Sequence, residues 1–385
     1  MGRNLIAMHY LKEPLSHIPQ DLVSVNDYQR YASSFIAPDI FAYIYGGGAD
    51  EITLRRNRQA LDRQFILPRV LQDVTQGTTA TTLLGDTLRY PLMLAPVAFQ
   101  RLVHPEGELA TAEAASVLDT GMVVSTLSSQ PIEKVAEKLT GPKWFQLYIQ
   151  QDRDFTLQLV KQAEAAGYTH LMVTIDAPLQ GIRNRAQRAG YMLPEGVEAV
   201  LLKDRPALPR GILEADQSIV LQGMMSEAPV WETLHWLQAR TRLPLILKGI
   251  LSPQDAALAK QAGMQGIVVS NHGGRTLDCV PSAIEMLPWI RKTVGDDYPI
   301  LVDGGIERGT DLFKALALGA NAAMLGRPQL YALAVAGALG VAHMLRVIRE
   351  EFEVTMAMAG VASVEAITSD LLISEAVLDK GVAAV

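Results

Sequence analysis

Cysteine is nearly absent from this chain. Its 385 residues include one cysteine, Cys279, so no internal disulfide can form and non-covalent packing must hold the fold together. A lone cysteine is compatible with a reducing compartment, and we expect a cytoplasmic protein. The N-terminus has no secretory pattern, because Lys12, Glu13 and Pro14 interrupt any apolar stretch there.

Long apolar runs and a strong charge of one sign are also missing. No uncharged apolar stretch reaches about 18 residues, the length typical of a membrane span. The nearest, residues 331–345, is interrupted by His343 and is rich in Ala and Gly. The net charge is −7, from 34 Lys and Arg against 41 Asp and Glu. We therefore expect no nucleic-acid partner and no membrane partner.

Several motifs of common cofactor sites are missing as well. No Cys-x-x-Cys, His-Glu-x-x-His, P-loop or Rossmann glycine fingerprint occurs, which argues against zinc, P-loop nucleotide and dinucleotide chemistry. We expect no metal site. The hydrophobic fraction of 49% allows a sizeable core, and the length fits one large domain as easily as two.

What the chain does contain is a repeat of short apolar runs, each followed by a helical pattern. Such runs are typical of buried strands, and Gly167, Gly263 and Gly319 stand where helix C-caps precede the next strand. Eight strand–helix units predict an α/β fold, a (β/α)₈ TIM barrel, with an open doubly wound sheet as the alternative. The runs are residues 92–97, 122–127, 144–149, 170–176, 244–249, 266–271, 299–304 and 322–326.

Two segments lie outside this repeat. The leading region has helical patterns and a hairpin signal at Gly85-Asp86. After the fourth expected strand, residues 184–229 form a long loop rich in Pro, Gly and charge, which we interpret as a lid-like cover over the barrel's C-terminal face. We assign residues 1–385 to one domain, made of an N-terminal helical extension (1–90), the barrel (91–340) and C-terminal helices (341–385).

Polar residues recur at the C-terminal ends of the expected strands. A barrel gathers these ends on one face, and polar groups in buried strands are costly unless paired, so the recurrence predicts a site there. The last two strands end in Gly304-Gly305 and Gly326-Arg327, which suit a phosphate site of close backbone N–H groups and one neutralising arginine.

The most informative segment is SNHGGRTLD, residues 270–278. It follows an apolar strand pattern and places His272 and Arg275 three positions apart on a turn loosened by Gly273 and Gly274. An imidazole there can accept a proton, and a guanidinium can bind a carboxylate through two hydrogen bonds. These are the two functions needed to oxidise a 2-hydroxy acid at its α-carbon.

This segment resembles the signature of the FMN-dependent 2-hydroxy-acid oxidases and dehydrogenases, the family that includes glycolate oxidase and lactate oxidase. The resemblance implies FMN-dependent oxidation of an (S)-2-hydroxy acid to the 2-oxo acid, with oxygen as acceptor and hydrogen peroxide as product. It also implies a homotetramer or homo-octamer. The other matching motifs are YGGGADEITLRRNRQAL (45–61), HPEGE (104–108), WFQLY (144–148), LKG (247–249), DGGIERGTD (303–311) and KALALGANAAMLGRP (314–328).

The resemblance assigns the catalytic roles residue by residue. His272 is the base, Asp176 orients it, and Tyr148 hydrogen-bonds the substrate oxygen. Whether a hydride or a carbanion is involved is left open. The substrate carboxylate is expected to bind to Arg183, Arg275 and Tyr28.

The resemblance also assigns the FMN site. Lys248 is expected beside flavin N1 and O2, where its charge stabilises the anionic reduced ring. The other expected cofactor contacts are Ala95, Pro96, Val97, Ala98, Ser128, Gln146, Thr174, Ser270, Asp303, Gly304, Gly305, Arg308, Gly326 and Arg327.

The chain departs from the family pattern at several places. Glu307 stands where an arginine usually approaches the flavin phosphate, and a carboxylate there should repel that phosphate. Gln130 and Gln180 stand where an aromatic and an apolar residue are common, which predicts a more polar substrate pocket. Val97 replaces a frequent threonine, so a hydroxyl contact to the flavin is lost.

Three other functions compete with the oxidase. The first is a dehydrogenase that passes electrons to a quinone or a protein acceptor. The second is a catalytically silent barrel, which the intact His272, Arg275, Asp176 and Lys248 disfavour. The third is another FMN barrel enzyme such as an isomerase, which the SNHGGR segment disfavours.

Overall fold

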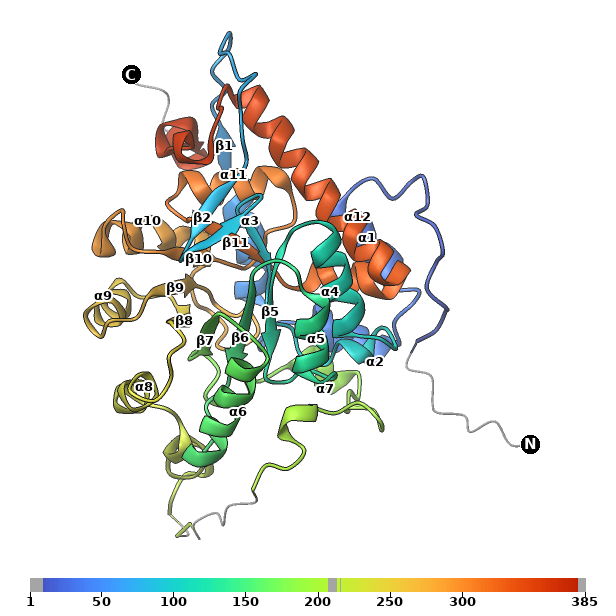
Figure 1. The fold of residues 1–385 in the computed structure, drawn as a ribbon, viewed down its shortest axis with the longest axis vertical. Helices are drawn as coiled ribbons and strands as arrows, with labels where there is room; N and C mark the ends of the chain where they lie inside the picture. The colour runs from blue at the N-terminus through green and yellow to red at the C-terminus, as the bar shows by residue number, and fades with distance from the viewer. Residues whose placement is uncertain (1–9, 207–212, 215, 380–385) are drawn as a thin grey trace.

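Eight parallel strands form a closed barrel in the computed structural model, which describes residues 10–206, 213–214 and 216–379 (Figure 1). Pairing of the last barrel strand with the first closes the ring and excludes the open-sheet alternative, so the predicted (β/α)₈ barrel is confirmed. The strands are β4 (Leu92–Leu94), β5 (Gly121–Ser125), β6 (Lys143–Leu147), β7 (His170–Thr174), β8 (Leu245–Ile250), β9 (Gly266–Val269), β10 (Ile300–Val302) and β11 (Ala322–Leu325).

One main helix follows each barrel strand. Local capping fixes where these helices begin: the Ser252 hydroxyl accepts from the backbone N–H of Asp255, and a capping box joins Ser282 to Glu285. The helices are α4 (Glu108–Val117), α5 (Ile132–Lys138), α6 (Arg153–Ala165), α8 (Trp231–Gln238), α9 (Pro253–Gln261), α10 (Ala283–Val294), α11 (Gly309–Ala317) and α12 (Arg327–Ala359).

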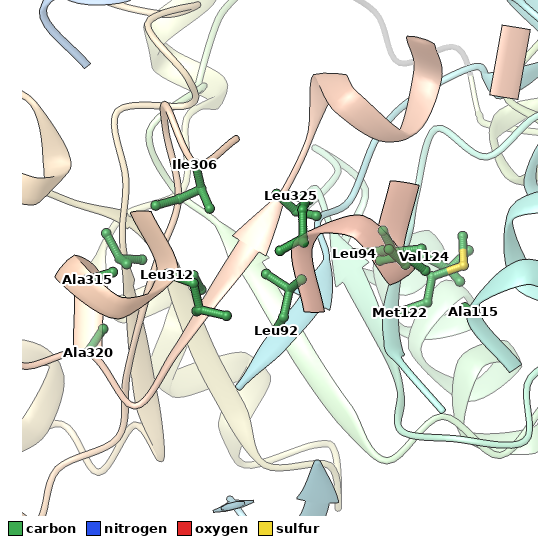
Figure 2. Packing of buried hydrophobic residues seen from close by; sticks show 14 of the residues in the cluster. Leu92, Leu94, Ala115, Met122, Val124, Ile306, Leu312, Ala315, Ala320 and Leu325 are labelled. Atoms are coloured by element: carbon green, nitrogen blue, oxygen red, sulfur yellow. The ribbon is translucent and has the colours of Figure 1, made fainter. Parts of the chain in front are cut away.

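The strands are apolar on both faces because alternate side chains serve two cores. Met93, Val123 and Met324 belong to the cluster inside the barrel. Their neighbours in sequence point outward and pack under the helices. Figure 2 shows part of this outer layer, where Leu92 and Leu325 lie near Leu312 of α11.

A short hairpin belongs to the inner cluster. Its strands, β2 (Thr81–Leu83) and β3 (Asp86–Leu88), are joined by Leu84 and Gly85, both with positive φ, as a tight two-residue turn requires. Leu83 and Leu88 pack with the barrel's interior side chains. Asp86 accepts a 2.7 Å hydrogen bond from the indole N–H of the fully buried Trp144 in β6.

The N-terminal extension contributes three helices, α1 (Val25–Ala32), α2 (Pro38–Tyr45) and α3 (Ile52–Asp62). The glycine run between α2 and α3 contacts the loop after β9: the N–H of Gly48 donates to the carbonyl of Gly274 at 2.7 Å. The Asp278 carboxylate accepts from the first N–H groups of α3, including that of Thr53 at 2.8 Å. These bonds hold α2 against the C-terminal face of the barrel.

Helix α12 is long and apolar enough to span a membrane by length and composition, and it is the one such helix among the described residues. Within the fold, 67% of its most apolar window is buried, and it packs against α1, α4 and α11. It bends at Ala336 and Gly337, which have non-helical angles. The packing is that of a core helix, and the barrel boundary expected at residue 340 falls inside it.

The remaining elements lie outside the barrel. Strand β1 (Gln64–Ile66) pairs antiparallel with β12 (Leu372–Ser374), which leads into α13 (Glu375–Asp379). The long loop after β7 begins with α7 (Asn184–Arg188) and continues through short helical turns. Part of the lid-like segment predicted at 184–229 lies outside the described residues, so its role as a mobile cover stays a prediction.

Replacing Asp86 with alanine is expected to destabilise the fold without affecting the C-terminal face. The change removes the acceptor for the buried indole N–H of Trp144, at a cost of about 1–3 kcal/mol in the free energy of unfolding. Urea denaturation measures this cost, and Thr87→Ala, at an exposed position of the same hairpin, is the control. Equal stability of the two variants would contradict the proposed link between hairpin and barrel.

Candidate active site

A pocket opens at the C-terminal ends of the barrel strands, beneath α2. It gathers residues from α2 and from the ends of most barrel strands. Several of the predicted site residues line it together. They are Ala95, Pro96, Val97, Ala98, Tyr148, Arg183, Lys248, His272, Arg275, Asp303, Gly304, Gly305, Gly326 and Arg327.

His272, which lines this pocket, forms a hydrogen-bonded pair with Asp176. The Nδ1 atom of His272 lies 2.9 Å from Oδ1 of Asp176, and the second carboxylate oxygen is buried with no partner among the described residues. His272 has a left-handed backbone, with φ of 56°, and Gly273 and Gly274 continue it. Such conformations are strained for a residue with a side chain and are typical of functional sites.

The electrostatics of the pair favour a neutral imidazole. Burial lowers the pKa of His272 below its ordinary value, and the charge of Lys248 adds to this lowering, while Asp176 opposes it. For Asp176, burial alone would raise the pKa, but His272 and Lys248 leave it lowered. Since Nδ1 faces the carboxylate, the free Nε2 atom of a neutral His272 is the one that can accept a proton.

Gly249 makes room for this pair. It follows Lys248 in β8 with φ of 113°, a region that side chains rarely adopt. A Cβ atom at this position would lie 2.4 Å from the Cβ of Asp176. Glycine in the sequence LKG is therefore required by the position of the carboxylate.

Lys248 is buried within a network of its own. Its Nζ lies 3.1 Å from Oδ2 of Asp303 and donates to the hydroxyl of Ser270 at 3.1 Å. That hydroxyl donates to Asp303 at 2.6 Å and accepts from the backbone N–H of His272 at 3.0 Å. Burial would lower the pKa of Lys248, but Asp303 and Asp176 raise it, so the ammonium stays charged beside the pocket.

Two arginines converge on Tyr43, at the end of α2. The guanidinium carbons of Arg183 and Arg275 lie 5.3 and 5.1 Å from the centre of its ring, and Tyr191 stacks on it at 4.1 Å. The Nε and Nη1 atoms of Arg183 are buried without a partner among the described residues. Buried, unpaired guanidinium donors at a pocket wall indicate an anion-binding site.

Arg275 and Arg327 are fixed by the C-terminal end of α2. Arg275 donates to the carbonyls of Tyr43, Ile44 and Gly46, and Arg327 to those of Ile44 and Gly46. Burial, with Arg183 and Arg327 nearby, lowers the pKa of Arg275 to about 9. Close cations that repel one another in a buried pocket are stabilised when an anion binds.

A buried polar network supports the floor of the pocket. Gln146 donates to Thr174 at 3.0 Å and accepts from the hydroxyl of Ser125 at 3.0 Å. Ser125 lines the main pocket, and Thr174 lines a chamber next to it. Gln146 itself is fully buried and positions these two hydroxyls.

The structure corrects the position expected for Tyr28. This residue is fully buried on α1, and its hydroxyl lies 2.9 Å from Nδ1 of His343 in α12, away from the pocket lining. Tyr43 occupies the pocket instead, beside Arg183 and Arg275. It stands two residues before the matched motif that begins at Tyr45, so its closeness to the glycine run was the available signal.

Three further positions lie elsewhere than expected. The hydroxyl of Ser128 donates to the carbonyl of Gln130, and neither residue lines the pocket, where Ser125 and Leu127 stand. Arg308 pairs with Glu351 of α12 at 2.9 Å, outside the pocket lining.

The other residues that differ from the family pattern do line the site. Val97 lines the main pocket, and Gln180 lines the adjoining chamber, which shares Leu127, Tyr148 and His272 with it. Glu307 lines the main pocket beside Arg327.

The residues present fit FMN. Gly304 and Gly305 have positive φ and leave backbone free of side chains at one end of the pocket, where α12 begins with Arg327. A helix N-terminus with an arginine suits a phosphate, although Glu307 opposes it. Ala95–Ala98 supply a narrow apolar wall, and Lys248 supplies a fixed cation for the ring.

Comparison with known proteins decides the family. The model of the FMN-dependent dehydrogenase family matches residues 32–374. The chain belongs to this family. An L-lactate oxidase of Alicycliphilus denitrificans is 46% identical over 93% of this chain and 98% of its own, and a glycolate oxidase of Arabidopsis thaliana is 39% identical over 90% and 95%.

The solved structures agree with the sequence relatives. A crystal structure of mandelate oxidase with benzoyl-formic acid matches with a TM-score of 0.82 and 41% identity, covering 91% of this chain and 98% of that one. Family membership establishes FMN as the cofactor and oxidoreduction as the chemistry.

Replacing Gly249 with alanine is expected to separate Asp176 from His272. The added Cβ would displace the carboxylate, so turnover should fall by about 10²-fold or more, the usual range for a disturbed general base. Gly263→Ala is the matched control, because it also has positive φ but its added Cβ meets only the flexible Gln238 side chain at 3.3 Å. Steady-state kinetics that show equal losses in both variants would rule out this role for Gly249.

Proposed function

We propose that this chain oxidises an (S)-2-hydroxy acid to the 2-oxo acid and reduces oxygen to hydrogen peroxide. The observation that carries the proposal is one pocket that combines a carboxylate-bound histidine with an arginine whose Nε and Nη1 donors are buried without a partner among the described residues. His272 supplies a base, and Arg183 with Arg275 supplies a carboxylate site. A 2-hydroxy acid has both groups on adjacent carbons.

The substrate carboxylate binds between Arg183 and Arg275, because the free guanidinium donors of Arg183 gain the partner that they lack. Tyr148 lines the same wall, and burial raises its pKa to about 12, so its hydroxyl stays protonated and donates to the substrate oxygen. Tyr43 holds both arginines in place through its ring.

His272 then accepts a proton from the substrate at Nε2. Asp176 stabilises the imidazolium that forms through its 2.9 Å contact with Nδ1. Oxidation to the 2-oxo acid releases two electrons and two protons, and oxygen takes up both pairs as hydrogen peroxide. FMN held in this pocket would supply the two-electron redox chemistry that links the α-carbon to oxygen. Lys248 holds a positive charge at the pocket wall throughout.

The space for the substrate's side chain supports acids larger than glycolate. Beside the main pocket lies a chamber of about 660 Å³ that shares Tyr148, Arg183 and His272 with it. Its wall is mixed, with Leu127 and Ile175 beside Gln180. Relatives are named for lactate, glycolate and mandelate, and a volume of this size accommodates all three side chains.

Oxygen is proposed over a quinone as acceptor. Ala98 lines the pocket. By the family resemblance this position faces the flavin, and oxidases tend to keep alanine there. The relatives named above are oxidases. The cytoplasmic location and the homotetramer or homo-octamer stay predictions.

Anaerobic reduction of the bound flavin by a panel of 2-hydroxy acids tests the function. Lactate, glycolate, mandelate and longer 2-hydroxy acids are mixed with enzyme in stopped flow, and the loss of flavin absorbance is followed. His272→Gln should slow reduction by about 10²–10⁴-fold with the flavin still bound. Because the pKa of His272 is lowered, reduction in the wild type should stay fast at neutral pH and fall only in acid, as the imidazole becomes protonated.

Air is then admitted to the reduced enzyme. Rapid reoxidation with one peroxide per flavin is the expected result. Slow reoxidation by oxygen beside fast reoxidation by a quinone analogue would assign the dehydrogenase instead, and an unbleached flavin with every acid would reject both.

A further inference from the structure

Glu307 is an acidic residue in the part of the pocket that suits a phosphate. It follows β10 and precedes α11, and it lines the pocket with Gly304, Gly305 and Arg327. Its backbone N–H donates to Asp311 at 2.9 Å, which fixes the main chain at this point. Glu307 thus shares the pocket lining with Gly326 and Arg327, where α12 begins.

Glu307 already lies among other charged groups before any ligand binds. Asp62, Asp311 and Glu307 are three carboxyl groups, while Arg58 and Arg327 are the two guanidinium groups that interact with Glu307. A phosphate adds roughly one and a half to two negative charges at neutral pH. The other titratable groups near this cluster are Tyr331 and Lys314, together with the ion pair of Arg308 and Glu351.

Two of the three carboxyl groups are already paired with Arg58. Arg58 binds Asp311 through both of its Nη atoms, at 2.6 and 2.8 Å, and lies 2.8 Å from Asp62. Asp311 also accepts the backbone N–H groups of Glu307 and Arg308. Glu307 has no hydrogen bond or ion pair of its side chain among the described residues, and Arg327 donates to backbone carbonyls instead. Glu307 is thus the carboxylate with the least to hold it ionised.

Burial acts in the same direction as the lack of a partner for the Glu307 side chain among the described residues. It raises the pKa of Glu307, and Asp311 adds to the increase, while Arg58 and Arg327 oppose it. An incoming phosphate is a further like charge at short range, which disfavours ionisation of a nearby carboxyl.

We propose that Glu307 binds the flavin phosphate as a neutral carboxylic acid, donating its own hydrogen bond to a phosphate oxygen, so that FMN binding takes up one proton. An acid in this form replaces repulsion with an O–H···O⁻ bond, a charge-assisted hydrogen bond. The inference rests on FMN as the cofactor and is independent of the substrate and of the acceptor.

Proton linkage gives the inference a direct test. The holoenzyme is dialysed to equilibrium at several pH values between about 5.5 and 8.5, and released FMN is measured by its fluorescence. The Kd for FMN should rise with pH by up to about tenfold per unit in the wild type, because Glu307 must be protonated on binding. Glu307→Gln is neutral at every pH and can still donate, so its Kd should change only with the phosphate's own titration, near pH 6.

Two controls separate this effect from others. Asp62→Asn removes a neighbouring carboxylate that Arg58 already holds, and it should keep the pH dependence of the wild type. Riboflavin, which lacks the phosphate, should bind the wild type and Glu307→Gln with the same pH dependence. Calorimetry of FMN binding in two buffers of different ionisation enthalpy counts the protons: about one at pH 8 in the wild type and none in Glu307→Gln.

The outcomes are distinct. Equal pH dependence of FMN binding in the wild type and Glu307→Gln, with no proton uptake, would overturn the proposal and place the Glu307 side chain away from the phosphate. Glu307→Arg should bind FMN more tightly than the wild type above pH 7, and weaker binding would contradict a phosphate-facing position. Flavin reduction by substrate is measured separately, so loss of the catalytic function would not affect this result.

Discussion

The structure of the site depends on burying three arginines in one pocket without carboxylate partners. No described carboxylate lies within ion-pair distance of Arg183, Arg275 or Arg327. Backbone carbonyls at the end of α2 hold Arg275 and Arg327, and the Tyr43 ring lies against Arg183 and Arg275. Burying unpaired cations costs free energy, and the anions that bind here recover it. A carboxylate and a phosphate are the two anions that the chemistry requires.

The same pocket keeps its base neutral. Burial lowers the pKa of His272, and the charge of Lys248 adds to this lowering. Asp176 opposes the lowering, orients the ring through its hydrogen bond to Nδ1 and stabilises the imidazolium once a proton arrives. This geometry requires a strained backbone at His272 and a positive φ at Gly249. Packing in the barrel's large core offsets the free energy of that strain.

The barrel could be predicted from the sequence because each strand is buried on both faces. Each of the eight expected runs overlaps one barrel strand, and the hairpin at Gly85 is present. The residues of the loop after β9 and of LKG were also predictable, because a motif fixes their spacing. Tyr28, Ser128 and Arg308 were misplaced because each was a single residue matched across turns of uncertain length. Tyr43 came into view only when the fold brought α2 over the strand ends.

The sequence alone shows that Glu307 stands in a motif expected to bind phosphate, where a carboxylate should repel the ligand. Whether it does so depends on which neighbouring charged groups are already paired. Only the fold shows that Arg58 is committed to Asp311 and Asp62. Motifs in the sequence therefore predict the family, but the pairing of the charged side chains around Glu307 can be seen only in the structure.

A crystal structure of the oxidised holoenzyme with a bound 2-oxo acid would test the role of Arg183, Arg275 and Arg327 most directly. The account predicts that the acid's carboxylate lies within hydrogen-bond distance of Nε or Nη1 of Arg183 and of the Arg275 guanidinium, with its keto oxygen facing Tyr148 and His272. A carboxylate bound elsewhere, with the Arg183 donors still unpaired, would contradict it.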